Sequence, residues 1–429
     1  MRAFLAAASM TAVLLGSPAC AQSLAPTPPP PAPANAQPRD LLPALIEHSR
    51  HVARIENGRL VGEGADFLRG LGARSHAVMI GEDHGNSGIA HFSEALWRDL
   101  ADAGFNYAAI ETDPWVAEAA VREIRAGGPS AWGRFVASRG GAMAAPFLTW
   151  APEVDLVATV LQTSRARRAP AIWGLDQTFI GAAAWQLDEI AANARDPEAR
   201  ALAARLAGEA RANIQWLGQS EAAPLQELRA HLSARRDARW AALVDAMLAS
   251  QAIYRPFTDG PGEATLANLA RERMMQRGFL AHWRAAREAD GQFPRVMLKF
   301  GAYHIYNGPT PTHVPGLGGF VANVLRAEGL ETLSIMTVCG PSSSLASFQG
   351  PPESCDQGFA QTWPILAPTT ERNALTIYDL RVWRLRGRRW EHLSADLQRV
   401  IESFDVLVVV PDAPASPWLE GLAQPHAPN

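Results

Sequence analysis

The chain has 429 residues, of which 48% are hydrophobic and 19% are charged, and its formal net charge at neutral pH is -4. This length and hydrophobic content are enough for one large folded domain or two smaller ones. The nearly balanced charge provides no basic surface for nucleic acid and no polybasic patch for a membrane, so neither is expected as a partner.

The first 21 residues have the pattern of a secretory signal peptide. A basic residue follows the initiator methionine, an apolar stretch covers 4–15, and small residues lead to Ala21. That stretch is too short to span a bilayer. We expect cleavage after Ala21 and a periplasmic or secreted protein. Lipidation at Cys20 is the alternative, although Ser17 occupies the position where a lipoprotein signal has a Leu-like residue.

Residues 22–40 are rich in proline and alanine, a composition that cannot bury a core and is typical of an extended linker. We therefore expect the folded, catalytic-type domain to cover residues 41–429.

Six short apolar runs in this region predict strands that are covered on both faces, as in a parallel sheet. Helical stretches lie between these runs. Between the first two runs, Ser87 is expected to cap a helix that ends at Gly104. The expected fold class is therefore α/β, with a layered, mostly parallel sheet flanked by helices. The six runs are Ala77–Ile80, Tyr107–Ile110, Ala171–Leu175, Val296–Phe300, Leu333–Val338 and Val406–Val410.

Residues from about 182 to 289 contain no strand pattern and are dominated by Ala, Leu, Arg and Glu. This composition predicts an all-helical insertion between two strands. The insertion is expected either to form one wall of a pocket or to be a purely structural extension.

Cys339 and Cys355 flank a loop rich in proline, serine and glycine. In an oxidising compartment we expect them to form a disulfide, and the alternative is two unrelated thiols.

Acidic and histidine side chains follow four of the predicted strands. Because the carboxyl ends of parallel strands line one edge of a sheet, these side chains are expected to meet in one cleft. The candidate site residues are Glu82, His84, Glu111, Asp176 and His304.

The residue types restrict the chemistry of this cleft. The chain contains neither a Gly-rich phosphate loop after the first strand nor a Gly-x-Ser-x-Gly nucleophile elbow. Histidines with carboxylates suit activation of water. They do so either by holding a divalent metal ion or by placing an imidazole as a general base that a carboxylate orients.

Two Gly-x-x-His motifs, Gly81–His84 in "IGEDHG" and Gly301–His304 in "KFGAYHIYNG", follow strands on either side of the insertion. With "IET" at Glu111, "GLDQ" at Asp176 and the ending "FDVLVVVPDAPASPWL", they resemble the motifs of one superfamily. That superfamily joins erythromycin esterase-like hydrolases, ChaN-like haem-binding proteins and the Tiki/TraB group. The resemblance covers most of the chain after the linker.

The resemblance implies a hydrolase for an ester or amide bond in a small-molecule or peptide substrate. By analogy with Tiki-like members, His84, Glu111 and His304 would bind a metal ion; by analogy with esterase-like members, His84 would activate water directly. The competing reading is a non-catalytic ChaN-like binder of haem or another iron-linked ligand, for which Tyr303 and Tyr306 are the nearby candidate ligands.

Other polar residues near the motifs are expected to have structural roles. Asp83 and Asp113 are expected to cap helices or to be solvated, and His91 is expected to lie on the surface because it falls off the apolar face of its helix. His313 lies in a turn-rich loop and is not included among the site residues.

Overall fold

The computed structural model describes residues 42–422, apart from 233–235, 260–263, 309, 349, 385–389 and 391–392. The expected signal peptide and linker lie outside these described residues. Among the described helices, none is both long enough and apolar enough to cross a membrane.

Nine strands of the described chain form one sheet in the order β2-β1-β10-β11-β7-β3-β6-β4-β5. The six strands from β11 to β5 are parallel, which confirms the predicted fold class. They coincide with the six apolar runs. The strands are β1 Arg50–Glu56, β2 Arg59–Val61, β3 Ala77–Glu82, β4 Tyr107–Ile110, β5 Ile172–Gly174, β6 Val296–Gly301, β7 Thr332–Cys339, β10 Leu375–Asp379 and β11 Val406–Val410.

Three antiparallel strands, β1, β2 and β10, extend the sheet at one edge and were not among the predicted strands. Strand β2 forms the edge and β1 lies beside it, and each has a single fully buried residue, so both lack the continuous apolar run that marked the central strands. β10 is fully buried, but its polar Thr376 and Asp379 interrupt the apolar pattern.

Side chains of the central strands alternate between two apolar layers. In β3, Val78 and Ile80 pack with helices on one face, whereas Ala77 and Met79 pack with helices on the other. The flanking helices are α1 Leu42–Ser49, α2 Glu63–Arg74, α3 Ser87–Asp102, α4 Pro114–Ser138, α5 Ala151–Thr163, α12 Ala302–Ile305, α13 Leu317–Ala327, α14 Asp356–Thr362, α15 Leu380–Arg384 and α16 Ala395–Ser403.

Two helix caps near the sheet edge test the expectations from sequence. Asp113 caps α4 as expected, since its carboxylate accepts from the N–H groups of Trp115 and Val116. The expected cap at Ser87 is wrong: α3 begins at Ser87, and the side chain of Asn86 accepts the Ile89 N–H. A residue one position earlier has the extended backbone that a cap requires.

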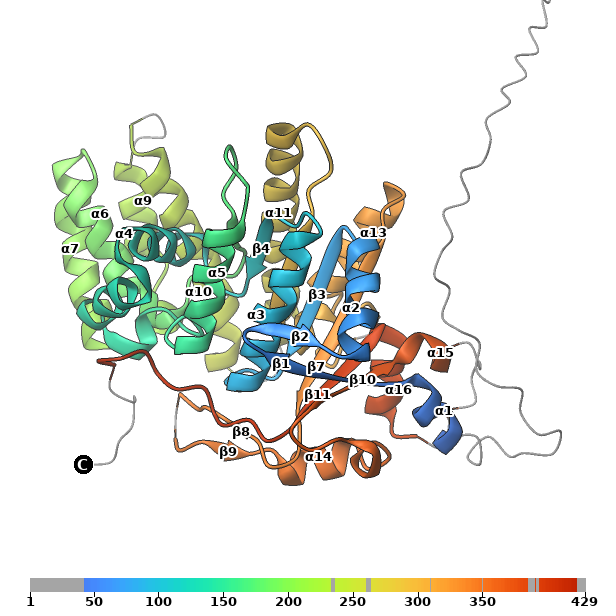
Figure 1. Cartoon of the computed structure of the whole chain (residues 1–429). Helices are drawn as coiled ribbons and strands as arrows, with labels where there is room; N and C mark the ends of the chain where they lie inside the picture. The colour runs from blue at the N-terminus through green and yellow to red at the C-terminus, as the bar shows by residue number, and fades with distance from the viewer. Residues whose placement is uncertain are drawn as a thin grey trace, which may run out of the picture.

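Between β5 and β6 the described residues form helices joined by loops, without a strand, and these helices build an apolar cluster of their own. Figure 1 shows α6, α7 and α9 grouped on the side of the molecule opposite α1 and α16. The last helix of this region, α11, returns to the sheet and packs Phe279 against Trp173 of β5. The helices are α6 Ala183–Asn193, α7 Pro197–Ala212, α8 Trp216–Gln219, α9 Ala223–His231, α10 Ala238–Asp259 and α11 Ala264–Asp290.

Cys339 and Cys355 form a disulfide, as expected, with their Cα atoms 5.9 Å apart. The loop that it closes carries the short hairpin of β8 (Ser344–Leu345) and β9 (Glu353–Ser354). This loop and the segment after β11 both bind the turn that follows β3. The N–H groups of Ala346 and Ser416 each donate to the Gly85 carbonyl at 2.8 Å, so the two segments hold the turn from both sides.

Candidate functional site

The carboxyl ends of β3, β4, β5 and β6 open into one pocket of about 580 Å³. All five site residues expected from the sequence line it, so the structure brings them together. The full lining is Glu82, Asp83, His84, Glu111, Thr112, Asp113, Pro146, Phe147, Asp176, Gln177, Phe179, Tyr254, Arg271, Gly301, Ala302, Tyr303, His304 and Leu345.

Glu111 lies at the centre of the polar groups. Its Oε2 is 3.3 Å from Nε2 of His84, and its Oε1 is 3.3 Å from Nε2 of His304. The Gly301 N–H donates to Oε2 at 2.6 Å and fixes the orientation of the carboxylate. The two histidines therefore converge on one carboxylate, although they lie more than two hundred residues apart in the chain.

Each histidine is anchored through its other ring nitrogen by a second carboxylate. Nδ1 of His84 is 2.9 Å from Oε1 of Glu82, and Nδ1 of His304 is 2.5 Å from Oε1 of Glu272 on α11. Glu272 is itself fixed, because its Oε2 accepts the Leu317 N–H at 2.8 Å. A carboxylate that accepts from Nδ1 leaves Nε2 as the atom that gains and loses a proton.

Behind the first pair lies a buried cation. Nζ of Lys299 on β6 is 2.5 Å from Oε2 of Glu82 and 2.7 Å from Oε2 of Glu153 on α5. Burial of such charges is tolerated only when they are paired and hydrogen-bonded. Lys299 thus provides the counter-charge for the carboxylate that anchors His84.

Asp176 reaches the centre through an arginine and not through the histidines. Arg271 of α11 donates to both carboxylate oxygens of Asp176, at 2.9 and 2.5 Å, and to Oε1 of Glu111 at 2.9 Å. Asp176 therefore holds the arginine that neutralises part of the charge on Glu111.

The glycines of the two Gly-x-x-His motifs allow the motifs to pack against each other. A Cβ at Gly301 would lie 2.7 Å from Nε2 of His84, and one at Gly81 would lie 3.0 Å from Cα of Ala302. Each motif therefore occupies the space that the other's glycine leaves free.

Charge pairing raises the pKa values of both histidines. Burial lowers the pKa of His84, but Glu111 and then Glu82 outweigh it and raise the value to about 10. Burial likewise opposes protonation of His304, whereas Glu111 raises its pKa to about 9. Burial tends to raise the pKa of Glu111, yet the two imidazoles hold it well below its usual range. An ionised carboxylate thus lies between two imidazoles that hold protons at neutral pH.

Phe147 covers the His84 imidazole, with the ring centroids 4.1 Å apart and the planes inclined by 17°. Its φ of 66° is rare for a bulky residue, and such conformations persist only where the surroundings enforce them. Phe348 of the disulfide loop packs against Phe147 with the ring centroids 6.3 Å apart. The loop therefore supports the ring that covers the histidine.

The remaining candidates occupy distinct positions. Asp83 is neither a helix cap nor fully solvated: its carboxylate accepts the Cys339 N–H at 3.0 Å, which joins the turn to the disulfide. His91 is exposed, as expected, and His313 is exposed as well. Tyr303 is exposed at the pocket, whereas Tyr306 is buried against Phe404.

Hydrogen bonds and ion pairs arrange His84, Glu111 and His304, the three residues that the metal-binding interpretation names. Both Nδ1 atoms are bound by carboxylates, and the two Nε2 atoms point to different oxygens of Glu111. In the part of the chain that the structure describes, these three residues do not form a group whose donor atoms all lie within 4.8 Å of one another. The donors form a hydrogen-bonded network in this structure, and binding of a metal ion by these three residues stays a prediction.

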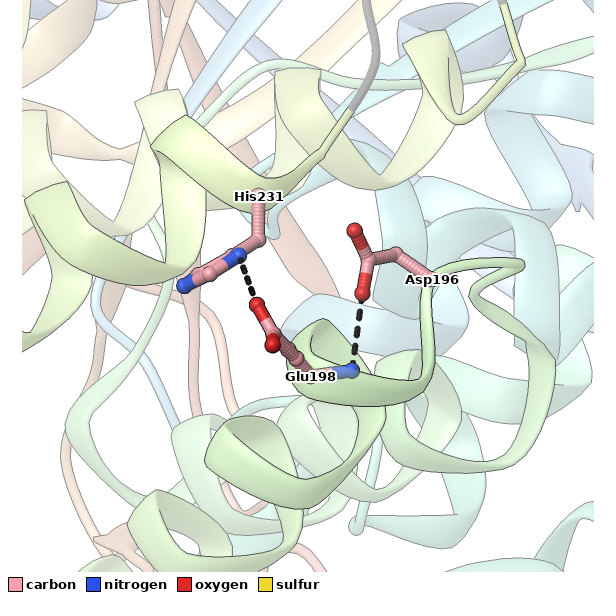
Figure 2. A group of neighbouring side chains, drawn as sticks. All are labelled: Asp196, Glu198 and His231. Atoms are coloured by element: carbon pink, nitrogen blue, oxygen red, sulfur yellow. Dashed lines mark hydrogen bonds and ion pairs between the residues drawn. The ribbon is translucent and has the colours of Figure 1, made fainter.

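The group that does meet this distance criterion is Asp196, Glu198 and His231, on α7 and α9 outside the pocket. Figure 2 shows that Asp196 turns to the backbone N–H of Glu198, to which it is bonded at 2.7 Å, while Glu198 pairs with His231 at 3.3 Å. Asp196 is the cap of α7. Capping and a surface ion pair explain the group, and we assign it no ligand.

Five side chains of the centre were not among the expected site residues: Phe147, Glu153, Arg271, Glu272 and Lys299. For two of them the sequence held a signal. Lys299 interrupts a buried apolar strand, and Glu272 falls in register with the buried Met275 and Phe279 of α11. A charge within an apolar pattern requires a buried partner. Arg271 lies in a strongly charged helical stretch, where the sequence gives no such contrast.

No protein-family model matches the chain, and no curated protein matches it in sequence. Among solved structures, a variant of erythromycin esterase EreC in its open conformation is similar, with a TM-score of 0.59, 13% identity, and coverage of 86% of this chain and 99% of that one. A succinoglycan biosynthesis protein gives a TM-score of 0.56, 14% identity, and coverage of 88% and 98%. ChaN of Campylobacter jejuni, described with bound haem, gives 0.31, 10%, and coverage of 67% and 91%. The first two similarities show that this chain shares its fold with these two proteins, and the first of them agrees at the level of the fold with the resemblance to erythromycin esterase-like proteins.

Proposed function

We propose that this protein is a hydrolase that activates water without a metal ion and cleaves an ester or amide bond. The observation that carries the proposal is the convergence of two oriented imidazoles on Glu111 inside one pocket. Nδ1 of each imidazole is held by a carboxylate, and Nε2 of each lies 3.3 Å from Glu111. The fold shared with an esterase agrees with this chemistry.

In the proposed reaction, Nε2 of His84 takes a proton from water as the water oxygen bonds to the substrate carbonyl carbon. The bond between that carbon and the leaving oxygen or nitrogen then breaks, and the leaving group takes a proton from Nε2 of His304. The products are a carboxylic acid and an alcohol or amine. Glu111 lies between the two Nε2 atoms, where it stabilises either imidazolium and can pass the proton back from His84 to His304.

The reactive state of this centre has one neutral and one protonated imidazole. Because the two histidines share Glu111, they titrate as a pair. Their pKa values, raised to about 9 for His304 and about 10 for His84, place the singly protonated pair between those pH values, mostly with the proton on His84. The reactive form is the minor one, in which Glu111 has passed that proton to His304. We therefore expect kcat/KM to rise as the pH increases toward about 9 and to fall above about 10.

The function is tested by assaying nitrophenyl esters and anilides with wild type, His84→Asn and the surface variant His91→Asn. We expect hydrolysis by wild type and by His91→Asn, and a loss of about 100-fold or more in His84→Asn, the usual contribution of a general base. A chelator should not change the rates. Hydrolysis by none of the three proteins, or equal rates in all three, would refute the proposal.

We also propose that the protein is exported through the signal peptide that ends at Ala21. The disulfide between Cys339 and Cys355 supports this, because such bonds persist in oxidising compartments. Amino-terminal sequencing of the protein recovered from a cell envelope fraction should begin at Gln22. An uncleaved cytoplasmic protein would contradict the proposal.

A further inference from the structure

Lys299 is the only lysine in the chain, although lysine and arginine together number 39 residues. Every other basic position that carries a permanent charge is an arginine. The single exception lies on β6 with 4% of its surface exposed, between Glu82 and Glu153. A chain that otherwise uses arginine therefore has its one lysine directly behind the candidate catalytic histidine.

We propose that Lys299 is a positioning residue, which acts through Glu82 to set the proton arrangement of His84. The proposal rests on the function proposed above, since it assigns a role within the same site. It also makes a prediction about the imidazole that holds whether or not a substrate is known.

The contacts of the ammonium group explain why a lysine occupies this position. Nζ has three N–H donors, and three carboxylate oxygens surround it: Oε2 of Glu82 at 2.5 Å, and Oε1 and Oε2 of Glu153 at 2.8 and 2.7 Å. The cavity beside it measures only about 20 Å³, roughly one water molecule. A guanidinium has five donors and a larger planar group, so an arginine would leave buried donors without acceptors.

Glu82 transmits the effect of this cation to the imidazole. One of its oxygens, Oε2, binds Lys299, and the other, Oε1, accepts from Nδ1 of His84. While Glu82 is ionised it can only accept a hydrogen bond, so Nδ1 carries the proton and Nε2 is the basic atom in the pocket. Without the cation, burial favours protonation of Glu82. A protonated Glu82 can donate to Nδ1, which then forces the proton of a neutral imidazole onto Nε2.

A set of three variants separates this role from a structural one. Lys299→Met leaves two buried carboxylates without a cation, and it is expected to be unstable. Glu153→Gln keeps the ion pair between Lys299 and Glu82, so Nδ1 of His84 should keep its proton in this variant. In the double variant Lys299→Met/Glu153→Gln, one buried charge of each sign is removed, so the melting temperature should recover toward that of wild type.

The decisive comparison is the activity of the double variant. We expect kcat to remain about 100-fold or more below wild type, because a catalytic imidazole loses that much when the carboxylate that orients it is removed. KM should change less than about threefold. ¹⁵N NMR of labelled histidine at neutral pH should show protons on both ring nitrogens of His84 in wild type. In the double variant it should show a neutral imidazole whose proton is on Nε2. Recovery of kcat together with the melting temperature would overturn the proposal.

The NMR measurement also keeps this proposal distinct from the proposed function. If wild type hydrolyses nothing, the proposed function fails, while the change of tautomer still supports the role of Lys299. If wild type hydrolyses esters but the double variant keeps its proton on Nδ1, the role of Lys299 fails and the hydrolase stands. If the double variant does not fold, Lys299→Gln/Glu153→Gln provides the same NMR comparison, because it also removes the cation, and an unchanged tautomer and rate in that variant would overturn the proposal.

Discussion

Glu111→Gln removes the charge that the two histidines share while it keeps the shape of the side chain. Nε2 of His84 lies 3.3 Å from this carboxylate. At that distance and an effective dielectric constant of about 20, two unit charges attract by about 5 kcal/mol, equivalent to about 3.7 pKa units. This is comparable to the rise from the ordinary value of 6.5 to about 10, which burial opposes and which Glu82 assists.

We expect the pKa of His84 to fall by about 2–3 units in Glu111→Gln, because Glu82 remains as a partner. The pKa of His304, now about 9, should fall as well, since Glu111 is its main charge partner. The assay is a titration of ¹⁵N-labelled histidine by NMR between pH 5 and 11. Glu288→Gln, at an exposed position of α11, is the matched control and should leave both values unchanged.

Two further outcomes of the titration decide whether this reasoning holds. A pKa of His84 that stays near 10 in Glu111→Gln would refute the assignment of Glu111 as the charge that the histidines share. A value near 6.5 in the wild-type protein would show that the ion pairs do not form in solution.

Three other predictions concern the geometry of the same centre. Glu272→Gln should lower kcat about 100-fold or more with little change in KM. The new amide oxygen would accept the Leu317 N–H, so the NH₂ group would face Nδ1 of His304 and impose the wrong tautomer. Steady-state kinetics and the histidine NMR spectrum check this. Gly301→Ala should abolish activity while circular dichroism stays native, since the new methyl group would lie 2.7 Å from Nε2 of His84; full activity would contradict the packing of the two motifs. Replacing both disulfide cysteines with serine should lower the free energy of unfolding by about 3 kcal/mol, the value expected when a disulfide closes a loop with a sequence separation of 16. Urea denaturation measures this change. An unchanged midpoint would show that the disulfide does not stabilise the fold.

The central strands and the site residues that follow them could be predicted from the sequence because one physical rule governs both. A strand buried on both faces gives a continuous apolar run, and a polar residue at its carboxyl end then marks the sheet edge. Glu82, Glu111 and His304 all followed such runs, and the structure places them in one pocket. Strand β1, next to the edge strand β2, followed no such rule, because only one of its residues is fully buried and its apolar pattern is weak.

The carboxylate that binds Nδ1 of His304 could not be located in this way. Glu272 lies on α11, in a region whose composition indicates only helices, and its approach to His304 depends on how that helix returns to the sheet. Such contacts are set by tertiary packing and not by local sequence. Lys299 is an intermediate case: its position in an apolar strand required a buried partner, but the sequence did not say which carboxylates supply it.

The central feature of the proposed mechanism is a metal-independent pair of histidines that shares one proton. The measurement that tests it is the pH dependence of kcat/KM for ester hydrolysis by protein from which metal ions have been removed by dialysis against a chelator. We predict full activity and a bell-shaped profile with its maximum between about pH 9 and 10, set by the pKa values of His84 and His304. Activity that disappears with the metal and returns when a divalent ion is added would contradict the account.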